Sequence, residues 1–271
     1  MIMQKIVLLT GGGDLPLEVI RNLKKQEIKF FCLVFCNNPV SKIIFRNDFK
    51  IINFGKIVTE LKELKLEGFS NILLIGNVKR PNLKEIKPDF NTIKLFPLFV
   101  KKLLQGGDNN LLDFSIIQLK KLGFRILDLR KVIPENFLGS GNQTKTTIIE
   151  ANLNDIKKGK IILDSNSKFD IGQSIIVQQG SVLGIEAAHG TDHLIKTSTS
   201  FKNDLRPTLI KLVKIKQNLK VDLPTIGITT LRNCKKHGIS GIAYSANKTL
   251  FIKKDEIINF CNKNNIFLFG V

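Results

Sequence analysis

The sequence has no tryptophan, a single tyrosine and no long apolar run, and each absence narrows what the protein can be. Because Trp is missing and Tyr244 is the only Tyr, the chain offers no aromatic platform for stacking bases, so its basic charge alone does not predict nucleic-acid binding. No stretch approaches the ~20 apolar residues of a membrane-spanning helix. The apolar start also lacks a signal-peptide cleavage site. We therefore predict a cytoplasmic protein.

Cysteine and arginine are scarce as well. The four cysteines form no C-x-x-C pair and no zinc-binding spacing, which is typical of reduced packing residues. Only seven of the 42 basic residues are arginine, and abundant Lys, Asn, Ile and Phe are typical of an A/T-rich coding sequence. The net charge of +19 suits anionic lipid headgroups or a phosphorylated substrate as well as nucleic acid. We expect no nucleic-acid partner.

Apolar segments that alternate with helical patterns predict a two-domain α/β protein. We predict a Rossmann-like parallel-sheet domain over residues 1–132, a linker over 133–150 and a second α/β domain over 151–271. The expected strands of the first half are 5–10, 28–35, 71–75 and 124–127, and its helices are 15–25, 56–66, 93–104 and 111–122. The second half should contain a hairpin (175–178 and 182–186), helices at 191–197 and 256–261, and strands at 208–215, 239–244, 249–252 and 266–269.

Two glycine-rich loops follow strands of the first domain. Gly11-Gly12-Gly13 opens a helix, where backbone N–H groups and the helix dipole can bind phosphate. A dinucleotide fingerprint would need a third glycine at Pro16 and an acidic residue near the end of the second strand, and neither is present. A tight turn is the alternative. The segment Gly76-Asn77-Val78-Lys79-Arg80 should lie at the same sheet edge, and a polar surface loop is equally consistent with it.

The second half carries most of the ligand-type side chains. Glu186, Asp192 and Asp222 together would make a hard oxygen site suited to Mg²⁺. His189 and His193 lie four residues apart, but without a third nitrogen or sulfur ligand we do not expect zinc.

Asp222 stands in the most informative segment, Val221–Ile228 (Val-Asp-Leu-Pro-Thr-Ile-Gly-Ile). Pro224 stiffens the turn, and Gly227 permits close approach of other backbone, so the carboxylate should be held rigidly. A rigid carboxylate suits a metal ion or a general base. The alternative is a helix that begins with Pro224 in its first turn.

Seven segments in order resemble the LpxI-type UDP-2,3-diacylglucosamine pyrophosphatases of lipid A synthesis. They are Gly11-Gly-Gly-Asp-Leu-Pro16, Phe54-Gly-Lys-Ile57, Gly76-Asn-Val-Lys-Arg-Pro81, Gly107-Asp108 with Leu111-Leu112, Asp170-Ile-Gly-Gln173, Glu186 to Asp192, and Val221 to Gly227. The resemblance implies two α/β domains with the lipid-linked nucleotide sugar between them, the second domain being catalytic. It also implies Mg²⁺-dependent hydrolysis of the diphosphate to UMP and 2,3-diacylglucosamine 1-phosphate.

The resemblance also implies which residues act. The essential aspartate falls on Asp222, which could be a metal ligand or a general base; from their oxygen chemistry we expect Asp222, Glu186 and Asp192 as the metal set. Both histidines lie outside it. The expected substrate-binding residues are Gly11, Gly12, Gly13, Leu15, Gly76, Asn77, Val78, Arg80, Gly107, Asp108, Gln173, Gly190, Thr191, Pro224, Thr225 and Gly227. For Asp108, capping of the following helix is an equally good interpretation.

The lipid substrate implies a place and partners. We expect peripheral attachment to the inner face of the cytoplasmic membrane through its anionic surface, with a homodimer as the default assembly. Residues 96–100 (Phe-Pro-Leu-Phe-Val) could line an acyl-chain groove or simply pack in a core. A non-catalytic nucleotide-sugar-binding protein and an NAD-dependent oxidoreductase are the alternative functions.

Overall fold

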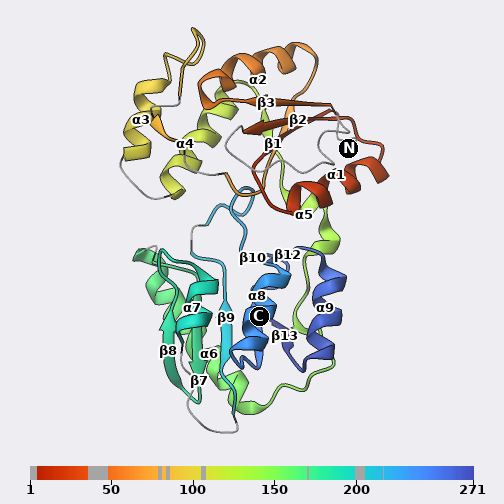
Figure 1. Cartoon of the computed structure of the whole chain (residues 1–271), viewed down its shortest axis with the longest axis vertical. Helices are drawn as coiled ribbons and strands as arrows, with labels where there is room; N and C mark the ends of the chain where they lie inside the picture. Colours follow the sequence, from red (N-terminus) through yellow and green to blue (C-terminus); the bar gives the residue numbers. More distant parts are fainter. Residues whose placement is uncertain are drawn as a thin grey trace. The chain divides into compact units, whose positions relative to one another are not determined.

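A computed structural model describes residues 5–35, 48–78, 81–83, 86–104, 108–169, 171–198, 205–215 and 217–271 (Figure 1). These residues form two compact units that divide after Val132. Each unit is an α/β structure, as the sequence predicts. Among the described helices, none is both long and apolar enough to cross a bilayer.

The first unit is built on a five-stranded parallel sheet with the order β3-β2-β1-β4-β5. The strands β1, β2 and β4 are almost entirely buried, because helices cover a parallel sheet on both faces. The elements of this unit are β1 (Ile6–Thr10), α1 (Leu15–Lys25), β2 (Phe30–Phe35), β3 (Phe49–Ile52), α2 (Ile57–Leu66), β4 (Asn71–Ile75), α3 (Phe96–Leu104), α4 (Asp108–Lys121), β5 (Arg125–Ile126) and α5 (Leu129–Val132).

The strand order reverses direction between β1 and β4, since the chain passes outward from β1 to β3 and returns to β4 on the other side. Open parallel sheets bind ligands beyond the carboxyl ends of their strands at such a switch point. The two glycine loops follow β1 and β4, so they lie at the switch point of this sheet.

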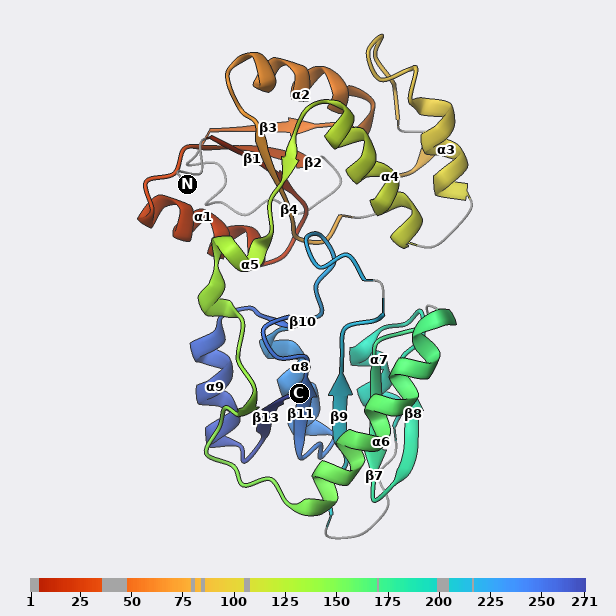
Figure 2. The same cartoon turned by 180° about the vertical axis from the view of Figure 1, so that it is seen from behind.

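The second unit has a six-stranded mixed sheet with the order β6-β13-β11-β9-β7-β8 (Figure 2). Its three central strands β13, β11 and β9 are parallel, and β7, β8 and β6 pair antiparallel. The elements are β6 (Gly141–Asn142), α6 (Glu150–Asn166), β7 (Ser174–Gln178), β8 (Ser181–Ile185), α7 (Thr191–Thr197), β9 (Thr208–Lys211), β10 (Thr225–Ile226), α8 (Ile228–Lys236), β11 (Gly241–Tyr244), β12 (Leu250–Phe251), α9 (Lys254–Lys263) and β13 (Phe267–Gly270).

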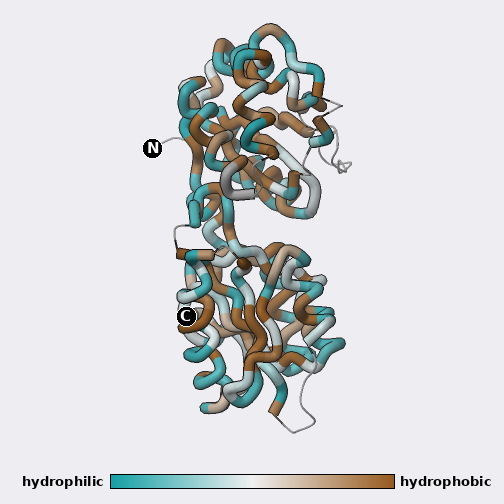
Figure 3. Tube along the Cα trace, turned by 90° about the vertical axis from the view of Figure 1, so that its left-hand side faces the viewer, coloured by the Kyte–Doolittle hydropathy of each residue, from teal (hydrophilic) through white to brown (hydrophobic). Residues whose placement is uncertain are grey.

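Alternating strand residues build a core on each face of this sheet. On β9, Leu209 belongs to the cluster shared with α7, α8 and α9, whereas its neighbour Ile210 belongs to the cluster under α6. This follows from the two-residue period of a strand. Figure 3 shows hydrophobic segments of the chain in both units. Cys234 and Cys261 are free and buried in the first cluster, and Cys32 is buried in the first unit, so these three pack as predicted.

One expectation about the middle of the chain is wrong, and one helix there was not predicted. The segment 133–150 is not a linker that stands apart, because it belongs to the second unit and contributes β6, which pairs with β13. The 17-residue helix α6 was not expected at all. Its buried face includes Asn152, Asp155 and Gly159, so an apolar period is hard to see in the sequence. A Cβ on Gly159 would lie 2.9 Å from Ile210 Cδ1, so glycine allows α6 to pack closely on the sheet.

Candidate functional site

Backbone hydrogen bonds join the two glycine loops of the first unit. Gly12 N donates to Asn77 O at 2.8 Å, and Asn77 N donates to Gly12 O at 3.0 Å. A Cβ on Gly11 would lie 2.2 Å from Asn77 O, so only glycine permits this approach. The structure therefore brings together the two loops that the sequence places at one sheet edge.

This pairing limits which groups can bind a phosphate. The Gly12 N–H is already used, so it cannot also cradle a ligand. Gly13 has a φ of +98°, and no atom of the described residues lies within 4 Å of where its Cβ would stand, while Gly76 has a φ of +78°. Leu15 begins α1 with Pro16 in its first turn, and Val78 is 44% exposed. Arg80 and Gly107 lie outside the described residues, and Asp108 is the first residue of α4.

In the second unit, three separate segments meet at the carboxyl end of β9. Ser174, the first residue of the antiparallel neighbour β7, is in register with Lys211, the last residue of β9. The loop after β8 joins them, because Glu186 N donates to Ser174 O at 2.8 Å and Glu186 Oε2 accepts from Gln173 N at 3.1 Å. The predicted residues Gln173, Glu186 and Thr191 thus lie in one cluster.

Glu186 is an internal anion of this cluster, with 8% of its surface exposed. Besides the Gln173 N–H, its carboxylate accepts the Thr191 hydroxyl at 2.8 Å. Burial by itself would raise the pKa of Glu186, but the charge of Lys211 and hydrogen bonds from Ser174, Thr191 and Gln173 N outweigh it and lower that pKa. Glu186 is therefore held ionised, with both oxygens engaged.

Lys211 is the cation of the same cluster and was not foreseen from the sequence. Its ammonium is buried and donates to Thr191 Oγ1 at 2.8 Å. Burial lowers the pKa of Lys211, and the charges of Glu186, Asp192 and Asp222 partly restore it. The signal was a lysine inside the apolar run 209–213 (Leu-Ile-Lys-Leu-Val), because a charged residue in a buried strand needs a partner.

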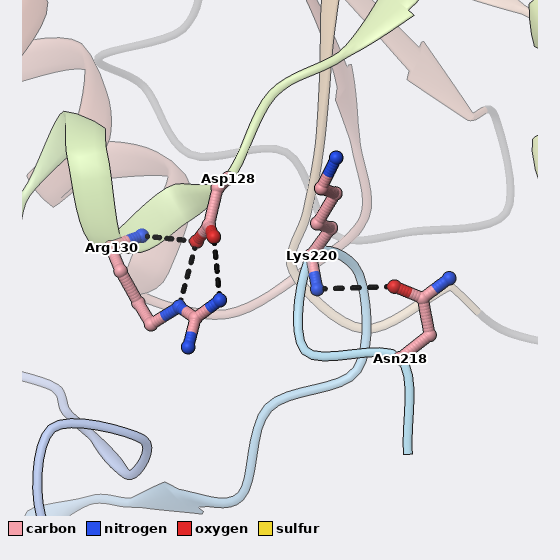
Figure 4. A network of polar contacts seen from close by, with 4 residues as sticks. All are labelled: Asp128, Arg130, Asn218 and Lys220. Carbon is pink, nitrogen blue, oxygen red and sulfur yellow. Dashed lines mark hydrogen bonds and ion pairs between the residues drawn. The ribbon is translucent and has the colours of Figure 1, made fainter. Parts of the chain in front are cut away.

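Asp222 follows a compact turn in the segment between β9 and β10. Asp222 N donates to Asn218 O at 2.9 Å, and the Asn218 side chain accepts from Lys220 N at 3.3 Å (Figure 4). One carboxylate oxygen accepts from Gln217 Nε2 at 2.7 Å, and Gln217 Oε1 in turn accepts from Lys214 N at 2.9 Å. The half-buried carboxylate is therefore held by its own loop.

Figure 4 also shows the Asp128 carboxylate, in the first unit, which accepts from Arg130 through Nε, Nη2 and the backbone N–H at 2.9, 2.6 and 3.0 Å. Burial would raise the pKa of Asp128, but the Arg130 contacts and the charge of Lys131 lower it. This pair fixes the entry to α5.

The residues after Asp222 correct two expectations. Pro224 does not begin a helix; its carbonyl accepts from Leu250 N at 2.8 Å, Thr225 begins β10, and α8 starts only at Ile228. The alternative of a helix start at Pro224 is therefore wrong. Gly227 has no atom within 4 Å of a Cβ position, so it is not a point of close backbone approach. It is the N-cap of α8, as Gly190, with a φ of +81°, is of α7.

Two buried acceptors near this cluster have no hydrogen-bond partner among the described residues. They are Asp192 Oδ1 and Gln173 Oε1. A buried acceptor without a donor is costly, so such atoms commonly mark a place for a cation, a water or a ligand. Within the described ranges, no group of three His, Cys, Asp or Glu side chains is arranged to hold a metal. Mg²⁺ is nevertheless usually bound by one or two carboxylates with waters and substrate phosphates, so Asp192 and Asp222 fit it.

His189 and His193 lie next to each other, with ring centroids 4.9 Å apart. Sequence reasoning missed Lys211 and Ser174 in this cluster and Gln217, which donates to Asp222. Ser174 and Gln217 carried no signal, because a lone Ser at a strand start and a Gln in a polar loop are ordinary.

Comparisons with known proteins cover both units. Residues 5–136 match the LpxI N-terminal domain, and residues 139–269 match the LpxI C-terminal domain. The chain is also 29% identical over 279 aligned residues to the UDP-2,3-diacylglucosamine pyrophosphatase LpxI of Caulobacter vibrioides, an alignment that covers 99% of this chain and 98% of that protein. From both domains in order along nearly the whole length, we conclude that the chain belongs to the LpxI family.

Proposed function

We propose that this protein hydrolyses the diphosphate of UDP-2,3-diacylglucosamine in a Mg²⁺-dependent reaction of lipid A synthesis, giving UMP and 2,3-diacylglucosamine 1-phosphate. The observation that carries the proposal is the match to a pyrophosphatase of that name over 99% of the chain. The carboxylates of the second unit add chemical support, since hydrolysis of a diphosphate needs charge neutralisation and a positioned water rather than covalent catalysis.

Asp222 is the proposed catalytic residue. Only one of its oxygens accepts a hydrogen bond from the described chain, that of Gln217, so the other is available to a cation or a water. With Asp192, whose Oδ1 has no hydrogen-bond partner among the described residues, it would hold Mg²⁺. Mg²⁺, when bound, neutralises phosphate charge and polarises water. If Asp222 instead acts as a general base, it takes a proton from the attacking water at its carboxylate.

The test is UMP release from radiolabelled UDP-2,3-diacylglucosamine. We expect EDTA to abolish it and excess Mg²⁺ to restore it. Asp222→Ala should lose at least ~10³-fold in turnover, the scale of removing a central catalytic group. Asp128→Ala is a matched control, because it removes an aspartate engaged with Arg130 in the first unit. Near-normal turnover of Asp222→Ala would refute the assigned role, and substrate binding without any UMP release would favour a nucleotide-sugar-binding protein.

We further propose that α3 docks the protein on an anionic membrane surface. No residue of α3 is buried, and three large apolar side chains are exposed on or just before it, Ile93 (52%), Leu98 (52%) and Leu104 (72%). The exposed Lys94 and Lys101 lie among them. An apolar surface interleaved with lysines suits the boundary between lipid headgroups and acyl chains. Because the proposed substrate is a lipid, a protein docked on the membrane surface through α3 would meet it there.

A further inference from the structure

We infer that Lys211 gives different roles to the three carboxylates that interact with it, Glu186, Asp192 and Asp222: it holds Glu186 as its own counter-ion and leaves Asp192 and Asp222 to take a divalent cation. The inference rests on the proposed function in that it assigns roles within the same candidate site. It differs from the sequence expectation, in which all three carboxylates are metal ligands.

The hydrogen bonds run in one direction from the lysine to the glutamate. Lys211 Nζ donates to Thr191 Oγ1 at 2.8 Å, and the Thr191 hydroxyl donates to Glu186 Oε1 at 2.8 Å. A hydroxyl has one proton, so Thr191 gives it to Glu186 and receives one from Lys211. The Gln173 backbone N–H donates to the second Glu186 oxygen, Oε2, at 3.1 Å. A metal ion at Glu186 would have to displace these donors.

Asp192 and Asp222 are in a different position. Within the part of the chain that the structure describes, Asp192 Oδ1 is buried and has no hydrogen-bond partner, whereas Asp222 is half-buried and accepts from Gln217 through one oxygen. Within the same part, Gln173 Oε1 is a further buried acceptor without a donor. Unsatisfied acceptors, rather than unsatisfied donors, are what a cation would complete.

Charge explains why a lysine is placed here. Lys211 interacts electrostatically with Glu186, Asp192 and Asp222. The formal charges of these four groups sum to −2, whereas the three carboxylates without the lysine would sum to −3. A site with three uncompensated carboxylates would bind a divalent cation tightly through Glu186 as well. With Lys211 present, the cation is restricted to two carboxylates and can keep positions for water and phosphate oxygens. Lys211 is thus a positioning residue.

The test is Mn²⁺ binding to the metal-stripped full-length chain without substrate, measured by calorimetry and by the loss of the free-ion paramagnetic resonance signal. Lys211→Met should bind Mn²⁺ at least ~10-fold more tightly than wild type, the scale of removing one positive charge that interacts with both proposed ligands. Lys211→Arg keeps the charge and should stay within ~3-fold. Lys196→Met is the matched control, because it removes an exposed lysine from α7. If Lys211 only stabilised the fold, its removal would weaken Mn²⁺ binding. Unchanged or weaker binding by folded Lys211→Met therefore overturns the inference.

A second comparison needs no lysine variant. Glu186→Gln should weaken Mn²⁺ binding less than Asp192→Asn does, because only Asp192 is assigned to the metal. The opposite ranking overturns the inference even if Lys211→Met does not fold. Since no substrate is used, these outcomes are separate from the proposed activity. Failure to release UMP would refute the pyrophosphatase and leave the cation result standing.

Discussion

A double-mutant cycle between Glu186 and Lys211 measures how much their pairing stabilises the second unit. Thr191 joins the two groups through hydrogen bonds of 2.8 Å each, so the opposite charges lie within about 6 Å of each other. At an effective dielectric constant of ~20, their attraction is about 3 kcal/mol. Both side chains are buried, so solvent screens them little.

Each single change leaves a buried charge without its partner. We expect Glu186→Gln and Lys211→Met each to lower the free energy of unfolding by ~2–4 kcal/mol. The double variant removes both charges and should lose clearly less than the sum of the two. The coupling free energy should be about 2–3 kcal/mol, because Thr191 can still hydrogen-bond to glutamine.

The chain provides a specific probe for this cycle. It has no tryptophan, and its only tyrosine, Tyr244, is fully buried in the second unit against Phe251. Tyrosine fluorescence during urea denaturation therefore reports the unfolding of that unit alone. Additive effects, with a coupling below ~0.5 kcal/mol, would show that the two charges do not interact and would refute the description of the cluster.

Three further predictions concern acid stability, membrane binding and a glycine loop. Burial raises the pKa of Glu186, but the charge of Lys211 and the hydrogen bonds outweigh burial, so the folded pKa lies below the unfolded value of 4.5. The stability that ionised Glu186 contributes is therefore present above pH 4.5 and is lost as the pH falls through the folded pKa. The difference in stability between wild type and Glu186→Gln, followed by Tyr244 fluorescence, should therefore shrink below pH 4.5, and a constant difference would contradict this. The double variant Leu98→Ser/Leu104→Ser should float poorly with vesicles that contain phosphatidylglycerol. The control Ile161→Ser changes a residue of α6 that is 67% exposed and should float like wild type. Equal flotation of wild type and both variants would exclude α3 as the docking surface. Gly11→Ala places a Cβ 2.2 Å from Asn77 O and should destabilise the first unit by more than ~2 kcal/mol, as measured by hydrogen exchange of the β1 and β4 amides. Gly227→Ala, where no described atom lies within 4 Å of the Cβ position, should change the stability of the second unit little. A neutral Gly11→Ala would mean that the two loops separate easily.

Much of the fold could be predicted because local patterns decide it. The helices Leu15–Lys25 and Thr191–Thr197 and the strand Asn71–Ile75 have the predicted bounds, since each combines a clear period with a clear end signal. The strand expected over 208–215 ends at Lys211, because the ladder to β11 stops there. The helix α6 was missed because its contact face contains Asn, Asp and Gly, and only packing against β7 and β9 shows why they are buried.

By itself, the sequence determined the α/β class, the glycine loops at the ends of β1 and β4, and Asp222 on a stiff loop before a proline. These features depend on residue type and on neighbours in the chain. Only the tertiary structure decided which polar groups meet. Lys211 and Glu186 are 25 positions apart, and the register of β7 with β9 brings their segments together around Thr191. Spacing along the chain carries no information on such a contact, because the hydrogen-bonded register of two strands, and not sequence distance, sets which side chains become neighbours.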